Sequence, residues 1–185
     1  MSLDLRRRWE CVWDAAMRPI GEGEHHKETF EAWWGRWRER LSHLDPRIAE
    51  QWVYRHWCHS YMAFLNLDDI TWRLEIWPGE AILGRVWMEF GGPMDAAHDY
   101  AAFNGVGGFG PIATARAMNA GTWDMPLLVL ETPTGIVSHD EGEMPDVRFV
   151  VAEGSKRMRY LNALLARGEG AGPHELFILS TPQIE

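Results

Sequence analysis

The strongest local signal in the sequence is Val150-Val-Ala-Glu-Gly-Ser-Lys-Arg-Met-Arg159. It begins with apolar, mostly β-branched residues, which are typical of a buried strand, and Glu153-Gly154 ends that strand. Ser155 can cap a helix that runs to about Arg167, because the apolar residues that follow then share one face. The sequence therefore predicts a strand that leads directly into the N-terminus of an amphipathic helix.

A helix start of this kind is suited to binding an anion. The first turn leaves backbone N–H groups unpaired, and the helix macrodipole makes that end positive. We therefore expect a phosphate site formed by the glycine, the serine and the cations of this turn: Gly154, Ser155, Lys156, Arg157 and Arg159. The alternative is that these cations lie on the helix surface and pair with the abundant carboxylates of the chain.

Three further residues are candidates near this turn. Glu153, at the end of the strand, would orient a metal or a hydroxyl group and is the candidate catalytic residue. Arg116, on an earlier helix, would reach the phosphates, although an isolated arginine is also typical of a surface ion pair. Glu131, which follows the apolar run Leu127–Leu130, would face Glu153.

The charge of the chain is unevenly distributed. The 185 residues include 27 acidic and 18 basic side chains, so the formal net charge is −9. Residues 1–60 carry ten basic and ten acidic side chains, whereas residues 61–185 carry eight and seventeen. This excess of acid disfavours binding of duplex DNA, which depends on many phosphate contacts. It also predicts that a polyphosphate would need Mg²⁺ as its companion ion.

The two cysteines, Cys11 and Cys58, are too few for the disulfide framework of a secreted protein, so we expect both to be reduced. No apolar run has the ~18 residues of a membrane span, and the first residues lack the apolar core of a signal peptide. These features predict a cytoplasmic protein without a membrane partner.

Hydrophobic periodicity predicts a mixture of helices and strands along the chain. Alternation of apolar and polar residues predicts a strand at 70–76, and short apolar runs predict others at 127–130, 148–152 and 175–179. Helices are expected at 3–18, 27–41, 47–58, 78–86, 95–103 and 111–120, and a loop at 132–146. The 11 tryptophans suit packing of the N-terminal helices better than stacking of nucleic-acid bases.

Two other motifs are weaker. Gly105-Val-Gly-Gly-Phe-Gly110 has the spacing of a dinucleotide-binding loop, but the residues before it read as a helix, so an ordinary loop or a phosphate cover is expected. His56-Trp-Cys-His59 lacks the spacing of a zinc site and is assigned to packing or to the surface. The sequence thus predicts no protein-bound metal.

The stretch Gly154-Ser-Lys-Arg-Met-Arg-Tyr160 resembles the signature box of the ParB/sulfiredoxin superfamily, in which a strand delivers the box to a helix N-terminus that holds nucleotide phosphates. Residues Ile112–Arg116, Gly121 and Pro126–Val129 are similar to the helix, glycine and strand that precede the box. The likeness covers residues 68–180. It implies a small mixed sheet with helices and a nucleotide as the ligand.

The chain also departs from that pattern. Ser155 stands where sulfiredoxins have their reactive cysteine and ParB proteins have a glutamate, so repair of sulfinic acids is excluded and hydrolysis is left open. Only 26 residues follow Arg159, too few for the helix-turn-helix domain with which ParB proteins bind DNA.

We therefore expect an α+β fold of ParB/sulfiredoxin-like type over residues 61–185, preceded by a Trp-rich helical region over residues 1–60. The expected function is binding of a nucleotide or another phosphate ligand, as an NTPase or phosphotransferase with Mg²⁺. The alternative is a non-catalytic interaction module, such as an antitoxin, immunity protein or regulatory protein, with a protein partner. A nuclease is a third hypothesis, which the acidic composition disfavours.

Overall fold

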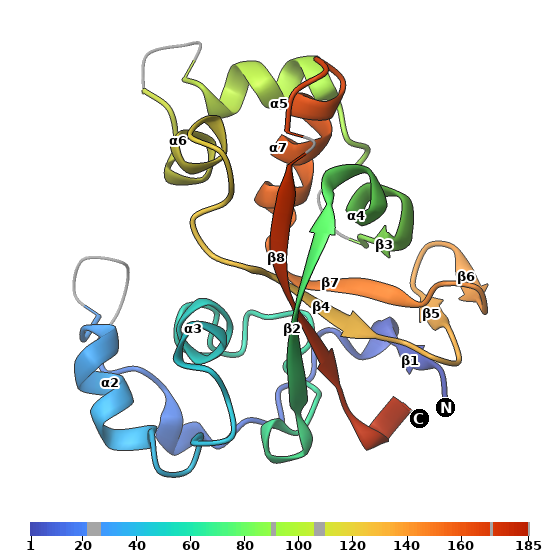
Figure 1. Ribbon diagram of the computed structural model, residues 1–185. Coiled ribbons are helices and arrows are strands. Elements are labelled where there is room, and N and C mark those ends of the chain that lie inside the picture. The colour runs from blue at the N-terminus through green and yellow to red at the C-terminus, as the bar shows by residue number, and fades with distance from the viewer. Residues whose placement is uncertain (22–26, 90–91, 106–109, 171, 185) are drawn as a thin grey trace. The chain divides into compact units, whose positions relative to one another are not determined.

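The strand and the helix predicted around residues 150–159 both form. Strand β7 (Phe149–Glu153) passes through Gly154 directly into helix α7 (Ser155–Leu165). The computed structural model describes residues 1–21, 27–89, 92–105, 110–170 and 172–184 (Figure 1). It contains helices and mixed sheets, which confirms the predicted α+β class.

The chain forms two compact units, and each is described by itself. The first unit comprises Met1–Trp72, Thr132–Asp146 and Leu179–Glu185, and the second comprises Arg73–Glu131 and Val147–Ile178. The expected N-terminal region of residues 1–60 lies entirely within the first unit.

Strand β7 belongs to a five-stranded sheet with the order β2-β8-β4-β7-β3. It runs antiparallel to β4 (Leu127–Glu131) and parallel to β3 (Val86–Trp87), so the sheet is mixed. The other two strands are β2 (Thr71–Pro78) and β8 (Pro173–Ser180). All four strands predicted from the sequence are therefore present in this sheet.

The helices of the second unit pack on this sheet. They are α4 (Gly79–Arg85), α5 (Ala96–Phe103), α6 (Ala113–Asn119) and α7, and the sequence predicted each of them. Helices α5 and α7 lie side by side (Figure 1). The apolar side chains of the helices and the strands form one buried cluster, which includes Trp77, Ile82, Val129, Val151, Leu161 and Ile178.

The first unit contains a three-stranded sheet with the order β1-β5-β6, formed by Leu3–Asp4, Ile136–Ser138 and Gly142–Met144. Its helices are α2 (Phe30–Trp37) and α3 (Pro46–Ile48), and α3 continues into a π-helical segment at Ala49–Tyr54. Short 3₁₀ turns occur at Leu5–Arg7, Ala15–Met17, Leu67–Asp69 and Pro182–Ile184. Trp33 and Trp52 are fully buried, as packing predicts.

The helix predicted at residues 3–18 is wrong. Leu3 and Asp4 pair instead with Ile136 and Val137 of β5. The Asp4 carboxylate accepts the N–H of Arg6, and that of Asp14 accepts the N–H of Ala16, so both aspartates cap short 3₁₀ turns. Local capping and a long-range strand pairing together override the helical periodicity of this segment.

The loop predicted at 132–146 is also wrong, because it contains the β5-β6 hairpin. Gly135 precedes this hairpin with a φ of 83°, and a Cβ at this position would lie 2.5 Å from the carbonyl oxygen of Met144. A short strand pair with few apolar residues has little periodicity, which is why the sequence pattern does not reveal it.

The cysteines are not reduced, contrary to the prediction. Cys11 and Cys58 form a disulfide between segments that are 47 residues apart in the sequence. Two cysteines without a motif carry no signal of their proximity, since the tertiary fold alone brings them together. In the described part of the chain, no helix combines the length and the apolar content that a membrane span requires.

Candidate functional site

The start of α7 is built around Gly154. This residue is the N-cap of the helix and has a φ of 114°, a left-handed conformation that favours glycine. A Cβ here would lie 2.6 Å from Cδ1 of Leu127 and 2.9 Å from Nη1 of Arg157. Ser155 is the first helical residue rather than the cap, so its predicted capping role is wrong. The fold itself therefore requires this glycine.

The first turn of α7 presents backbone donors at its end. The N–H groups of Arg157 and Met158 donate to the carbonyl oxygen of Gly154, at 2.8 and 3.1 Å. Among the contacts of the described residues, none occupies the N–H groups of Ser155 and Lys156. The first turn contains no acidic residue and the N-cap supplies no side chain. This helix end is therefore positive, and no acceptor among the described residues occupies it.

Two of the three cations in this turn are paired within the second unit. Arg157 is buried, and its Nε lies 3.2 Å from Oδ1 of Asp124. Arg159 donates from Nε and Nη2 to Oδ1 of Asp99, at 2.9 and 2.8 Å. Lys156 is exposed. Arg157 and Arg159 thus pair with carboxylates, which was the alternative to a phosphate-binding role in the sequence analysis.

Asp99 is a residue that sequence reasoning missed. It lies on α5, is 2% exposed, and its Oδ2 is buried without a hydrogen-bond partner among the described residues. The Asp99–Arg159 pair joins α5 to α7. A signal was present in the sequence, since Asp99 lies at helical spacing between Ala96 and Phe103, on the face that should be apolar.

A closed ring of hydrogen bonds joins three helices close to this pair. Asn104 Nδ2 donates to the hydroxyl of Tyr160 at 2.7 Å, and that hydroxyl donates to Oδ1 of Asn119 at 2.8 Å. Asn119 Nδ2 closes the ring by donating to Oδ1 of Asn104 at 3.0 Å. Tyr160 is fully buried, so this ring satisfies its hydroxyl group and fixes α5, α6 and α7 to one another.

Of the other candidates, Glu153 lies at the start of α7, whereas Arg116 and Glu131 have contacts elsewhere. Arg116 is exposed on α6 and donates to the carbonyl oxygen of Pro111. Glu153 is half-buried at the end of β7, where it pairs in register with Leu128. Glu131 pairs with Phe149 at the opposite end of the ladder and binds Arg73, so the expectation that it faces Glu153 is wrong.

The described residues at the start of α7 do not form a metal site by themselves. They fit a metal ion only if it arrives bound to the ligand. In the part of the chain that the structure describes, no three His, Cys, Asp or Glu residues are grouped as a metal site requires. Glu153 supplies one carboxylate at the helix start, and Asp124 is engaged by Arg157. Mg²⁺ bound to a polyphosphate commonly takes one or two carboxylates from the protein.

The structure bears on the two weaker motifs of the sequence. Cys58 of the His56–His59 stretch is in the disulfide and is not a thiolate ligand. The residues before the glycine-rich stretch form helix α5, which confirms that the strand of a dinucleotide-binding loop is missing. Residues 106–109 of that stretch lie outside the described residues.

No protein-family model matches this chain, and neither a curated protein nor a solved structure is similar to it. The resemblance to ParB/sulfiredoxin-like proteins therefore stays a hypothesis based on residues 68–180.

Proposed function

We propose that the protein binds a phosphate-bearing small molecule, in the first instance a nucleotide, at the N-terminus of α7. One observation carries the proposal: the helix begins at a glycine without a side-chain cap, and its first turn has no acid. The N–H groups of Ser155 and Lys156 and the Lys156 ammonium group would bind the phosphate. The paired arginines, Arg157 and Arg159, would hold α7 in place.

Glu153 and Mg²⁺ would complete the site. The metal would arrive on the polyphosphate and screen its charge against a chain with a net charge of −9. Glu153 would orient either this ion or an attacking hydroxyl group. Phosphoryl transfer or nucleotide hydrolysis is the reaction class that such a site would serve, since positioning and charge supply most of that catalysis.

The experiment is a thermal-shift screen of ATP, GTP and inorganic phosphate, each with and without Mg²⁺. A ligand at ~100 times its Kd stabilises the folded state by about 2.7 kcal/mol, or about 5–10 °C in Tm for a chain of this size. Lys156→Ala should reduce the shift. The matched control is Arg167→Ala, which removes an exposed cation that pairs with Glu169 at the other end of α7. Equal shifts in both variants would contradict the proposal.

A non-catalytic interaction module is the second candidate. It is supported by the Arg157–Asp124 and Arg159–Asp99 pairs, because these pairs neutralise two of the three cations that a phosphate site would use. The same screen separates the two candidates: no shift with any of the three ligands favours the interaction module.

A cytoplasmic location remains part of the proposal, with a test of its own. Glutathione and thioredoxin keep cytosolic thiols reduced, so the Cys11–Cys58 disulfide of the structure counts against this location unless the bond is reduced in the cell. Alkylation of intact cells, followed by mass spectrometry of this peptide pair, measures the reduced fraction.

A further inference from the structure

The first unit contains a pocket that is independent of the proposed site. Its volume is about 750 Å³, within the range of small-molecule sites. Residues between 11 and 21 form one wall, residues between 55 and 59 form another, and Lys27 also lines it. The Cys11–Cys58 disulfide joins the two walls, so the shape of the pocket is held by a covalent bond.

The pocket is lined by positive charge. Arg18, Lys27 and Arg55 contribute to its surface, and none of the described lining residues is a carboxylate. The Arg18 side chain makes no hydrogen bond or ion pair with the residues that the structure describes. Arg55 lies 4.0 Å from Glu50, at a partly exposed position where an ion pair contributes little. Of the cations that line the pocket, Arg18 and Arg55 are therefore the ones that an anionic ligand would contact most readily.

Lys27 is held close to Arg55. Its Nζ donates to the carbonyl oxygens of Tyr54 and Arg55 and lies 4.3 Å from the centroid of the Tyr54 ring. Burial lowers the pKa of the Lys27 ammonium group, and the charge of Arg55 lowers it further. An anion in the pocket would offset this repulsion between like charges.

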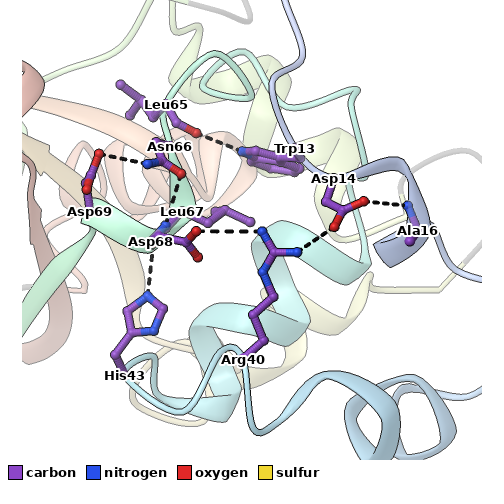
Figure 2. Close-up of polar contacts among 10 residues, drawn as sticks. All are labelled: Trp13, Asp14, Ala16, Arg40, His43, Leu65, Asn66, Leu67, Asp68 and Asp69. Atoms are coloured by element: carbon purple, nitrogen blue, oxygen red, sulfur yellow. Dashed lines mark hydrogen bonds and ion pairs between the residues drawn. The ribbon is translucent and has the colours of Figure 1, made fainter.

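An aromatic wall stands beside these cations. Trp13 and Trp57 both line the pocket, and their ring centroids are 5.6 Å apart. Trp13 is held rigidly, because its indole N–H donates to the carbonyl oxygen of Leu65 at 3.0 Å. Figure 2 shows this bond and, next to it, the Arg40 side chain that bridges the carboxylates of Asp14 and Asp68. A wall fixed in this way needs little ordering when a ligand binds.

We propose that this pocket binds an organic anion in which a flat aromatic ring carries a carboxylate or phosphate group. The ring lies against Trp13 and Trp57, and the oxyanion pairs with Arg18 and the neighbouring cations. This inference concerns residues of the first unit alone and does not depend on the site at α7.

The test is isothermal titration calorimetry with two probes of the same shape, 2-naphthoate and the neutral 2-naphthalenemethanol. We expect the anion to bind at least about tenfold more tightly than the alcohol, since hydrogen bonds to charged groups are the strong ones. Arg18→Ala should weaken binding of naphthoate about tenfold and leave that of the alcohol unchanged. Arg38→Ala, another exposed arginine of the first unit outside the pocket, is the matched control.

Circular dichroism of each variant verifies that the fold is intact. Equal affinities of the two probes, or equal losses in Arg18→Ala and Arg38→Ala, would overturn the proposal. A nucleotide also joins a ring to an oxyanion, so the nucleotide screen is repeated with Arg18→Ala. A shift lost only in this variant overturns the site at α7 and supports the pocket, whereas a shift lost only in Lys156→Ala does the reverse for nucleotides.

Discussion

Replacing Gly154 with alanine tests how α7 is built. At a φ of 114° an L-residue is strained, and the new methyl group would lie 2.6 Å from Cδ1 of Leu127 and 2.9 Å from Nη1 of Arg157. Leu127 is fully buried in the central strand β4, and Arg157 is buried and paired with Asp124, so a shift of either side chain would disturb core packing or an ion pair. Two separate costs therefore add at this position.

The magnitudes follow from these two costs. A non-glycine residue in a left-handed conformation costs ~1–2 kcal/mol, and overpacking in a dense core costs ~1–3 kcal/mol. We expect Gly154→Ala to lower the free energy of unfolding by about 2–5 kcal/mol. Gly121→Ala is the control, because Gly121 has a φ of 134° with no atom within 4 Å of the added Cβ. It should show the backbone cost alone.

Urea denaturation followed by circular dichroism measures both variants. The difference between them isolates the steric cost, since each carries the cost of a positive φ. If Gly154→Ala and Gly121→Ala lose the same free energy, the close approach at the start of α7 is refuted. A large loss at Gly154 would also show that its presence needs no ligand to explain it.

Three further predictions concern stability. Cys11→Ser/Cys58→Ser removes a cross-link between residues 47 apart and should cost about 4 kcal/mol in the chain-entropy model; denaturation with and without reductant measures it, and no loss would refute it. Asp99→Ala leaves Arg159 without its carboxylate and should cost ~3–5 kcal/mol; a double-mutant cycle with Arg159→Ala checks the coupling, and additive losses would contradict the pair. The Ala16 N–H and the Arg40 guanidinium lower the pKa of Asp14, so its stabilisation is present above the unfolded pKa and is lost as the pH falls through the folded pKa. The Tm difference between wild type and Asp14→Asn should therefore shrink below about pH 4, and a constant difference would rule this out.

The second unit could largely be predicted because each of its helices and strands has a recognisable pattern within a short stretch of sequence. Strand β7, the break at Gly154 and the amphipathic helix α7 are adjacent in the sequence, so one window of residues contains the whole signal. Asp99 could not be assigned to Arg159 in this way, since the two residues are far apart in the chain and meet only when α5 packs on α7.

The first unit resisted prediction for a related reason. Residues 3–18 have the periodicity of a helix, but Leu3 and Asp4 pair with a strand that begins at Ile136. The aspartates at 4 and 14 cap turns that interrupt any helix, and a single sequence does not reveal whether an aspartate caps a turn or faces solvent. Non-local pairing thus overrides local propensity where the segments are short.

The cations that are clustered in the sequence are not the same as the cations that line a pocket in the fold. In the sequence, three cations are clustered at residues 156–159, within a half of the chain that is otherwise acidic. In the fold, two of them are engaged with Asp124 and Asp99, while the neutral first 60 residues gather Arg18, Lys27 and Arg55 around one pocket. A cation count over a segment does not show which charges have carboxylate partners. If both sites bind anions, raising the ionic strength should weaken both, and Arg18→Ala and Lys156→Ala should each affect only one of them.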